Sequence, residues 1–271
     1  MTPIEDILDL ERIDDNIYRG IPAESGLVRT FGGHVAAQAL VAATRTVGDD
    51  KKVHSLHGYF LRPGNAAQET VFVVDRVRDG RSFTTRSVSA IQNGKTIFTM
   101  EASFHIRGDK GPEHSDTMRT VPDPGLVPEH NLPYAPPELL EEWSLFELRI
   151  VDPKDYDHNK YAASQQVVWF KSKAPLPDDE TFHICALAYM SDMTLIHSTT
   201  LPHKEEKVDI ASLDHAMWFL RPFRADEWLV YDQFSPSAAD GRALAHGRIF
   251  DQQGNLVAMV TQEGLNRYSE Q

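Results

Sequence analysis

The stretch Phe60-Leu61-Arg62-Pro63 recurs later in the chain as Phe219-Leu220-Arg221-Pro222, and an aromatic residue precedes it both times. A tight-turn pair follows each copy, Asn93-Gly94 after the first and Gly254-Asn255 after the second. Markers that repeat in the same order indicate that one structural unit has been duplicated. The chain has 271 residues, which is comfortable for two domains of about 100 to 150 residues each.

Each half has the same order of predicted strands. In the first half, residues 70–75, 82–91 and 96–106 have the apolar pattern of strands. The pair Asn93-Gly94 is typical of a hairpin turn in which both central residues have positive φ. Strands joined by short hairpins pair antiparallel. The second half repeats the pattern at residues 229–231, 242–250 and 256–264.

One helix is predicted before the strands of each half. Apolar residues fall on one stripe from about 33 to 47, and a similar stretch runs from about 179 to 200 with a break near Ser191-Asp192. Residues 112–137 contain seven prolines, which disfavour regular ladders and favour extended structure. We expect an N-terminal domain at 1–110, a proline-rich linker at 111–140 and a C-terminal domain at 141–271.

Composition argues against several classes of protein. The formal net charge of -13 disfavours non-specific nucleic-acid binding, which needs a basic surface. No apolar run is long enough to insert into a membrane, and neither end has a secretory or peroxisomal signal, so we expect a cytoplasmic protein. The single cysteine, Cys185, lies in an apolar run that favours a buried position over a nucleophile.

Common hydrolase signatures are absent from the sequence. There is no Gly-x-Ser-x-Gly elbow and no His-Glu-x-x-His helix. His54 and His57 are three residues apart, which places them on opposite faces of a strand and weakens a metal-site interpretation. No metal site is therefore predicted.

Four long motifs together resemble one family. The stretches 31-FGGHVAAQAL-40 and 54-HSLHGYFLRPG-64 are similar to the N-terminal half of the acyl-CoA thioesterase II family. The stretches 213-LDHAMWF-219 and 260-VTQEGL-265 are similar to its C-terminal half. The resemblance implies an α+β fold of two fused hotdog domains, each a long antiparallel sheet wrapped around one central helix.

The same resemblance implies an active site. In the family a carboxylate, a hydroxyl and a carboxamide hold one water, and these groups fall on Asp192, Ser212 and Gln262. Threonine replaces the serine in some members. A carboxylate can take the proton of a water that attacks a thioester carbonyl, and the other two groups can orient that water.

The helix start at Gly32, Gly33 and His34 is predicted to face these three groups, because the repeat sets Gly33 opposite Asp192. Backbone N–H groups at a helix start suit oxyanion and substrate binding. His54 is an accessory candidate, because a histidine near a thioester can act as a base.

Each of the three implied active-site residues, taken alone, is also compatible with an ordinary structural role. Asp192 suits a helix N-cap, Ser212 a surface strand and Gln262 an edge strand. We expect one site per chain, because the first half lacks the three groups. At the equivalent positions it has Gly33, Val53 and Ala102.

The implied activity is that of a thioester hydrolase, which converts acyl-CoA to a fatty acid and coenzyme A without a cofactor. One alternative is a hotdog enoyl-CoA hydratase or dehydratase, and another is a non-catalytic acyl-thioester-binding protein. Only hydrolysis releases a thiol with water alone. Arg62 and Arg221 are predicted either to pair with acids or to meet coenzyme A phosphates. Resemblance also implies a homo-oligomer.

Overall fold

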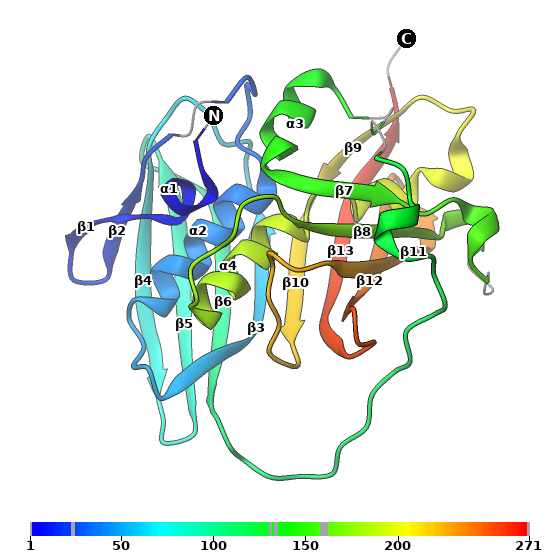
Figure 1. The fold of residues 1–271 in the computed structure, drawn as a ribbon. Helices are drawn as coiled ribbons and strands as arrows, with labels where there is room; N and C mark the ends of the chain where they lie inside the picture. Colours follow the sequence, from blue (N-terminus) through cyan, green and yellow to red (C-terminus); the bar gives the residue numbers. More distant parts are fainter. Residues whose placement is uncertain (1, 23–24, 130–131, 133–134, 158–161, 270–271) are drawn as a thin grey trace.

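The computed structural model describes residues 2–22, 25–129, 132, 135–157 and 162–269. Their strands form one antiparallel sheet (Figure 1). In the first half these are β1 (Glu11–Asp14), β2 (Ile17–Gly20), β3 (Lys51–Phe60), β4 (Thr70–Asp79), β5 (Phe83–Gln92) and β6 (Lys95–Ile106). In the second half they are β7 (Phe146–Ile150), β8 (Gln166–Ser172), β9 (Val208–Ser212), β10 (Asp214–Phe219), β11 (Leu229–Ala239), β12 (Arg242–Asp251) and β13 (Leu256–Tyr268).

The described residues also form α-helices and short 3-10 turns. The α-helices are α1 (Ile4–Leu8), α2 (Gly32–Thr44), α3 (Pro137–Glu142) and α4 (Glu180–Met190). Short 3-10 turns are η1 (Pro124–Leu126), η2 (Trp143–Leu145), η3 (Pro153–Asp155), η4 (Ala162–Ser164), η5 (Ile196–Thr199) and η6 (Leu201–His203). No helix in the described ranges is long and apolar enough to cross a membrane.

The two halves share one sheet because β3 pairs antiparallel with β10, with Leu56 opposite Met217. The strand order is β1-β2-β4-β5-β6-β3-β10-β13-β12-β11-β8-β7, and β9 pairs with the end of β13. Each half thus has its own antiparallel meander, and β3 and β10 connect them at the centre. The predicted pair of hotdog domains is confirmed.

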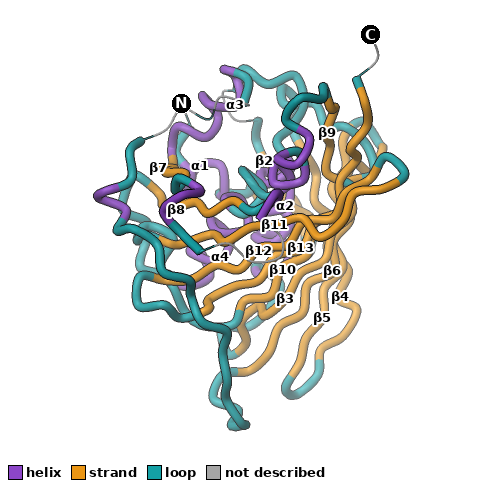
Figure 2. Tube along the Cα trace, turned by 90° about the vertical axis from the view of Figure 1, so that its right-hand side faces the viewer, coloured by secondary structure: helices purple, strands orange, loops and turns teal. Residues whose placement is uncertain are grey.

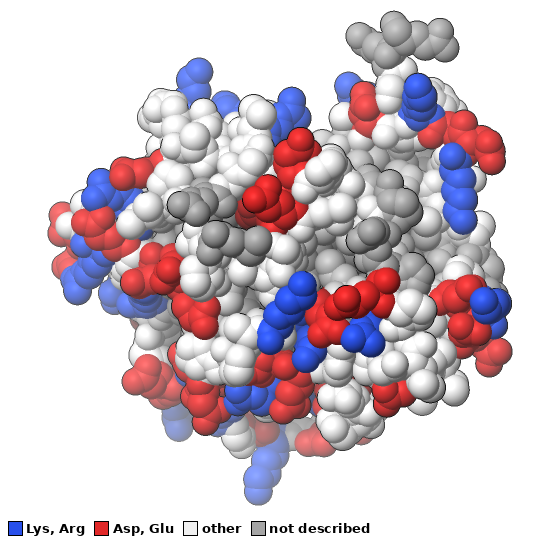
Figure 3. Space-filling model, turned by 45° about the horizontal axis from the view of Figure 1, so that its top comes forward, with Lys and Arg blue, Asp and Glu red and all other residues white. Residues whose placement is uncertain are grey.

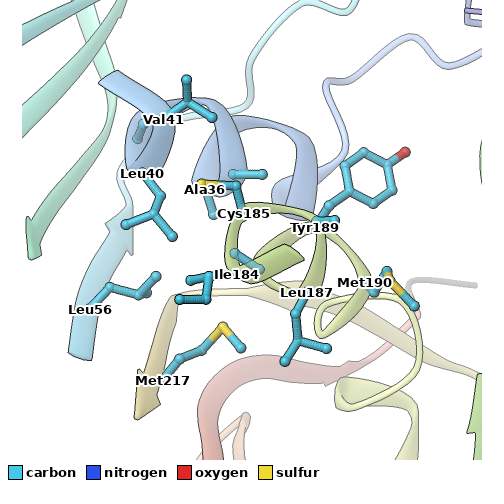
Figure 4. Packing of buried hydrophobic residues seen from close by; sticks show 14 of the residues in the cluster. Ala36, Leu40, Val41, Leu56, Ile184, Cys185, Leu187, Tyr189, Met190 and Met217 are labelled. Carbon is cyan, nitrogen blue, oxygen red and sulfur yellow. The ribbon is translucent and has the colours of Figure 1, made fainter. Parts of the chain in front are cut away.

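Helices α2 and α4 lie together on the inner side of the curved sheet (Figures 1 and 2). Every residue of α2 from Gly33 to Ala43 is buried, as expected for a helix enclosed on all sides. Its many alanines favour the helix and allow close approach. Leu56 of β3 and Met217 of β10 point toward the helix pair from below (Figure 4).

The predicted turns and the predicted helix break are confirmed. Asn93 and Gly94 have φ values of 48° and 70°, as a primed hairpin turn requires. Helix α4 ends at Met190, where the hydroxyl of Ser191 donates to the carbonyl oxygen of Ala188. The predicted helix to residue 200 is therefore too long, because the chain forms turns and then η5 beyond this point.

The proline-rich segment runs along the second half (Figure 1). Trp169 Nε1 of β8 donates to the carbonyl oxygen of Pro122 at 2.9 Å. Arg119 Nε lies 3.0 Å from Asp232 Oδ2, and Asp232 is fully buried. Residues 130–131 and 133–134 of the predicted linker lie outside the described residues. The domain boundaries at 110 and 140 stay a prediction.

Candidate active site

Three polar side chains from separate elements meet beside α2. Asp192 follows α4, Ser212 ends β9, and Gln262 lies in β13. Gln262 Nε2 donates to Asp192 Oδ1 at 2.6 Å and to Ser212 Oγ at 2.8 Å. Gln262 Oε1 is buried and has no partner in the described part of the chain, so it remains an acceptor. One carboxamide thus fixes a carboxylate and a hydroxyl in a site where Gln262 is 0% and Asp192 6% exposed.

The first turn of α2 approaches Asp192 through two glycines. A Cβ atom on Gly32 would lie 2.5 Å from Asp192 Oδ2, and one on Gly33 would overlap the carbonyl oxygen of Tyr189. The backbone N–H of Gly33 donates to the Asp192 carboxylate. No side chain caps this helix start, so its positive end faces the carboxylate. The structure therefore brings Gly32 and Gly33 next to Asp192.

Burial raises the pKa of Asp192 to about 6, although hydrogen bonds from Gln262, Gly33 and Ser212 oppose the rise. At neutral pH this carboxyl group is ionised in most molecules, and its affinity for a proton is higher than that of an exposed aspartate. A base with a pKa near the working pH is well matched to proton abstraction.

His215, which belongs to the motif 213–219, is a buried neighbour of the site. Its Nδ1 lies 3.9 Å from Asp192 Oδ1 and has no hydrogen-bond partner among the described residues. Its Nε2 lies 2.8 Å from the hydroxyl of Ser191. Burial lowers the pKa of His215 to about 4, so the ring is neutral at pH 7. A neutral imidazole here adds no positive charge to the site.

A cavity of about 250 Å³ reaches this site at Gly32 and Ser212. Gly32 and Ser212 line it on the side of the polar groups, and Val35, Phe60 and Phe98 supply apolar walls. A substrate that enters this cavity reaches the start of α2 and the hydroxyl of Ser212 together. In the described residues, no group of three or more His, Cys, Asp and Glu side chains is placed to hold a metal.

Comparisons with known proteins identify the family. The family described as "Acyl-CoA thioesterase" matches residues 147–265, and the "Acyl-CoA thioesterase N-terminal domain" matches residues 22–105. "Acyl-CoA thioesterase 2" from Haemophilus influenzae is 37% identical over 97% of this chain and 96% of its own. "Acyl-coenzyme A thioesterase 8" from Homo sapiens is 37% identical over 98% of this chain and 89% of its own.

The chain belongs to the acyl-CoA thioesterase II family. The crystal structure of the acyl-CoA thioesterase II TesB2 from Mycobacterium marinum has a TM-score of 0.89. It is 54% identical, over 98% of this chain and 99% of that one. The predicted membership is confirmed, and the enzyme class is that of an acyl-CoA thioester hydrolase.

His34, which follows the two glycines, turns away from Asp192, Ser212 and Gln262. Successive helix residues are rotated by about 100°, and the His34 Nδ1 lies 3.9 Å from Glu142 Oε1. Burial opposes ionisation of Glu142, but hydrogen bonds from His34, Ser25 and Tyr189 hold its pKa below the ordinary value. Tyr189 donates to Glu142 at 2.9 Å. Glu142 therefore ties α3 to α2 and α4, a role that its place in the sequence did not indicate.

His54 lies elsewhere in the fold. Its Nε2 is 2.9 Å from the hydroxyl of Ser103 on the neighbouring strand β6. The residue of β3 that reaches the site is Phe60, which lines the cavity and approaches Gly32. Six residues along a strand span roughly 20 Å, so the structure does not bring His54 to Asp192.

Proposed function

We propose that this chain hydrolyses acyl-CoA by attack of a water held by Asp192, Ser212 and Gln262. The observation that carries the proposal is the carboxamide of Gln262, which bridges Asp192 Oδ1 and Ser212 Oγ beside the uncapped start of α2. The three groups match the demands of thioester hydrolysis, which needs a base and fixed acceptors and donors for one water.

In this mechanism the water oxygen bonds to the thioester carbonyl carbon as its proton passes to Asp192. The negative charge that develops on the carbonyl oxygen is stabilised by the positive end of α2 at Gly32, beside the Gly33 N–H that donates to Asp192. The intermediate then expels coenzyme A as its thiolate, which takes the proton back from Asp192. Fatty acid and free thiol are the products, and the carboxylate is regenerated.

The test measures thiol release from acyl-CoA with a chromogenic thiol reagent. The variant Asp192→Asn keeps the shape of the side chain and removes the base, so we expect kcat to fall about 100-fold or more. The matched control is Asp75→Asn, an exposed carboxyl group on β4, which should retain wild-type turnover. Circular dichroism checks that both variants fold. Full turnover by folded Asp192→Asn would contradict the proposal.

An enoyl-CoA hydratase or dehydratase is the second candidate function. It is favoured by one observation, the histidine His215 at 3.9 Å from Asp192. Hydration of enoyl-CoA consumes the absorbance of the conjugated double bond and releases no thiol, so the two reactions are separated in one cuvette. Binding without either change would instead indicate an acyl-thioester-binding protein. A homo-oligomer and a cytoplasmic location stay predictions.

A further inference from the structure

The cavity lined by Gly32 and Ser212 has a basic rim. Among the described residues that line it are Arg29 and Arg62, and no aspartate or glutamate. The chain has 40 acidic and 27 basic residues, so an acid-free basic cavity runs against its overall charge. A larger cavity of about 570 Å³, between the far ends of α2 and α4, has charges of both signs. Its lining includes Glu5, Asp6, Asp9, Asp49 and Asp179 together with Arg45, Lys51 and Lys52.

Arg29 is held at this rim by its backbone. Residues 28–30 run antiparallel beside residues 64–66, with Arg29 opposite Asn65 and the N–H of Thr30 donating to the carbonyl oxygen of Gly64 at 3.0 Å. The Arg29 side chain is exposed and forms no ion pair within the described ranges. Its guanidinium is therefore available to a ligand.

Arg62 belongs to the repeated Phe-Leu-Arg-Pro motif. It differs from its counterpart Arg221 in the hydrogen bonds that its guanidinium group forms. Arg221 donates to the carbonyl oxygens of Leu256 and of His114, which belongs to the proline-rich segment. Arg62 donates through Nη1 to the carbonyl oxygen of Thr96 at 2.6 Å and is otherwise exposed at the cavity. That bond orients the guanidinium and leaves its other N–H groups free to bind.

Two guanidinium groups that have no carboxylate partner in the described part of the chain suit phosphate oxygens, to which arginine donates paired, charge-assisted hydrogen bonds. Phe60, Ile97 and Phe98 line the same cavity. A ligand with phosphates at one end and a long neutral arm would place the phosphates on the arginines and pass the arm along these apolar side chains toward Ser212.

We propose that Arg29 and Arg62 bind phosphate groups of coenzyme A at the mouth of the catalytic cavity. The assignment rests on the proposed thioesterase activity, because it takes the thioester to lie at Asp192. The two arginines give an acidic enzyme a local site for a polyanionic substrate. Acidic groups elsewhere on the surface repel that substrate little, because salt screens charges beyond roughly 10 Å.

The experiment compares one acyl group on two thiols, coenzyme A and N-acetylcysteamine, which lacks the nucleotide and its phosphates. For Arg29→Gln and Arg62→Gln we expect kcat/KM for acyl-CoA to fall about tenfold relative to that for the short thioester. The double variant should lose more. The control is Arg81→Gln in the turn between β4 and β5, at the opposite end of the strands from Ile97, and it should keep the wild-type ratio.

An unchanged ratio in the double variant, or an equal loss on both substrates, would overturn the assignment. Hydrolysis of neither thioester by the wild-type chain would instead be a failure of the proposed function. The arginines are then tested alone by calorimetric titration with coenzyme A. Weaker binding by the double variant than by Arg81→Gln supports the site, and equal dissociation constants refute it.

Discussion

The carboxyl group of Asp192 is buried, and burial raises its pKa to about 6. A carboxyl group whose pKa is higher in the folded chain than in the unfolded chain binds its proton more tightly when folded. The folded state therefore loses stability relative to the unfolded one as pH rises from about 4 to about 6. The bonds from Gln262, Gly33 and Ser212 offset part of this cost and keep the group ionised at neutral pH.

The pH dependence of turnover follows from this pKa. Asp192 must be ionised to accept a proton, and the ionised fraction is lost as pH falls through about 6. We expect kcat/KM to decrease about tenfold for each pH unit below that value. A pH–rate profile on acyl-CoA measures it, with the residual rate of Asp192→Asn as the reference. A profile without an inflection between pH 5 and 7 would argue against Asp192 as the base.

Gly32 allows a second test of the same contact. The variant Gly32→Ala places a methyl group 2.5 Å from Asp192 Oδ2, so the carboxylate or the helix start must shift. We expect kcat/KM to fall about tenfold or more, because catalytic groups tolerate little displacement. Gly111→Ala is the control, since a Cβ atom there meets nothing within 4 Å. Equal activities of the two variants would show that the close approach is unimportant.

At the scale of the elements, the proline-rich segment is attached to the second half by ion pairs as well as by packing. Asp232 on β11 is fully buried and accepts from Arg119 Nε at 3.0 Å and Arg248 Nη2 at 2.6 Å. Arg248 also pairs with Asp116, an earlier residue of the same segment. Two points of this segment are thus tied to one buried carboxylate network on the second half.

Replacing Arg119 tests that attachment. Arg119→Met removes the charged donor and keeps much of the side-chain volume, and Asp232 retains Arg248. We expect the free energy of unfolding, measured in urea, to fall by about 2 kcal/mol. Arg12→Met, which breaks an ion pair with Asp15 on the surface, should leave the urea midpoint almost unchanged. If both variants unfold at the wild-type midpoint, the segment is held by other contacts.

Strands that follow the alternating pattern were predictable, and others were not. The meander strands begin within one residue or so of their predicted starts. Strands β5 and β12 show the alternation of buried and more open positions that makes a strand recognisable. Strand β8 could not be recognised from the alternating pattern, because Gln166 to Phe170 are all buried and therefore do not alternate. Helix α4 ends early because Ser191 and the turn after it satisfy its last carbonyl groups.

The site was predicted from the family motifs and not from periodicity. Asp192, Ser212 and Gln262 lie on three elements, and no spacing rule relates residues that only tertiary structure brings together. Their placement agrees with the resemblance, whereas their catalytic roles stay a proposal. His34 and His54 show the limit of motif reading, because a residue inside a matching stretch can point at a different neighbour, such as Glu142 or Ser103.

For the whole molecule, charge is distributed without a large basic surface on the face shown in Figure 3, where acidic and basic side chains are interspersed. The basic rim of the cavity at Gly32 and Ser212 is therefore a local feature. The site it leads to takes Gly33 from the first half and Asp192, Ser212 and Gln262 from the second. Neither half contains a complete site.

The pairing of β3 with β10 has a further effect on how the enzyme behaves in solution. Each half alone would leave one of these strands as an open edge, ready to pair with any other chain. If the two halves were separate chains, the site would form only when they associate, and dilution would shift that equilibrium toward the separated halves. Because the halves are covalently joined, the effective concentration of one half near the other is high and does not depend on the protein concentration. The composite site within one chain therefore stays assembled however scarce the protein becomes.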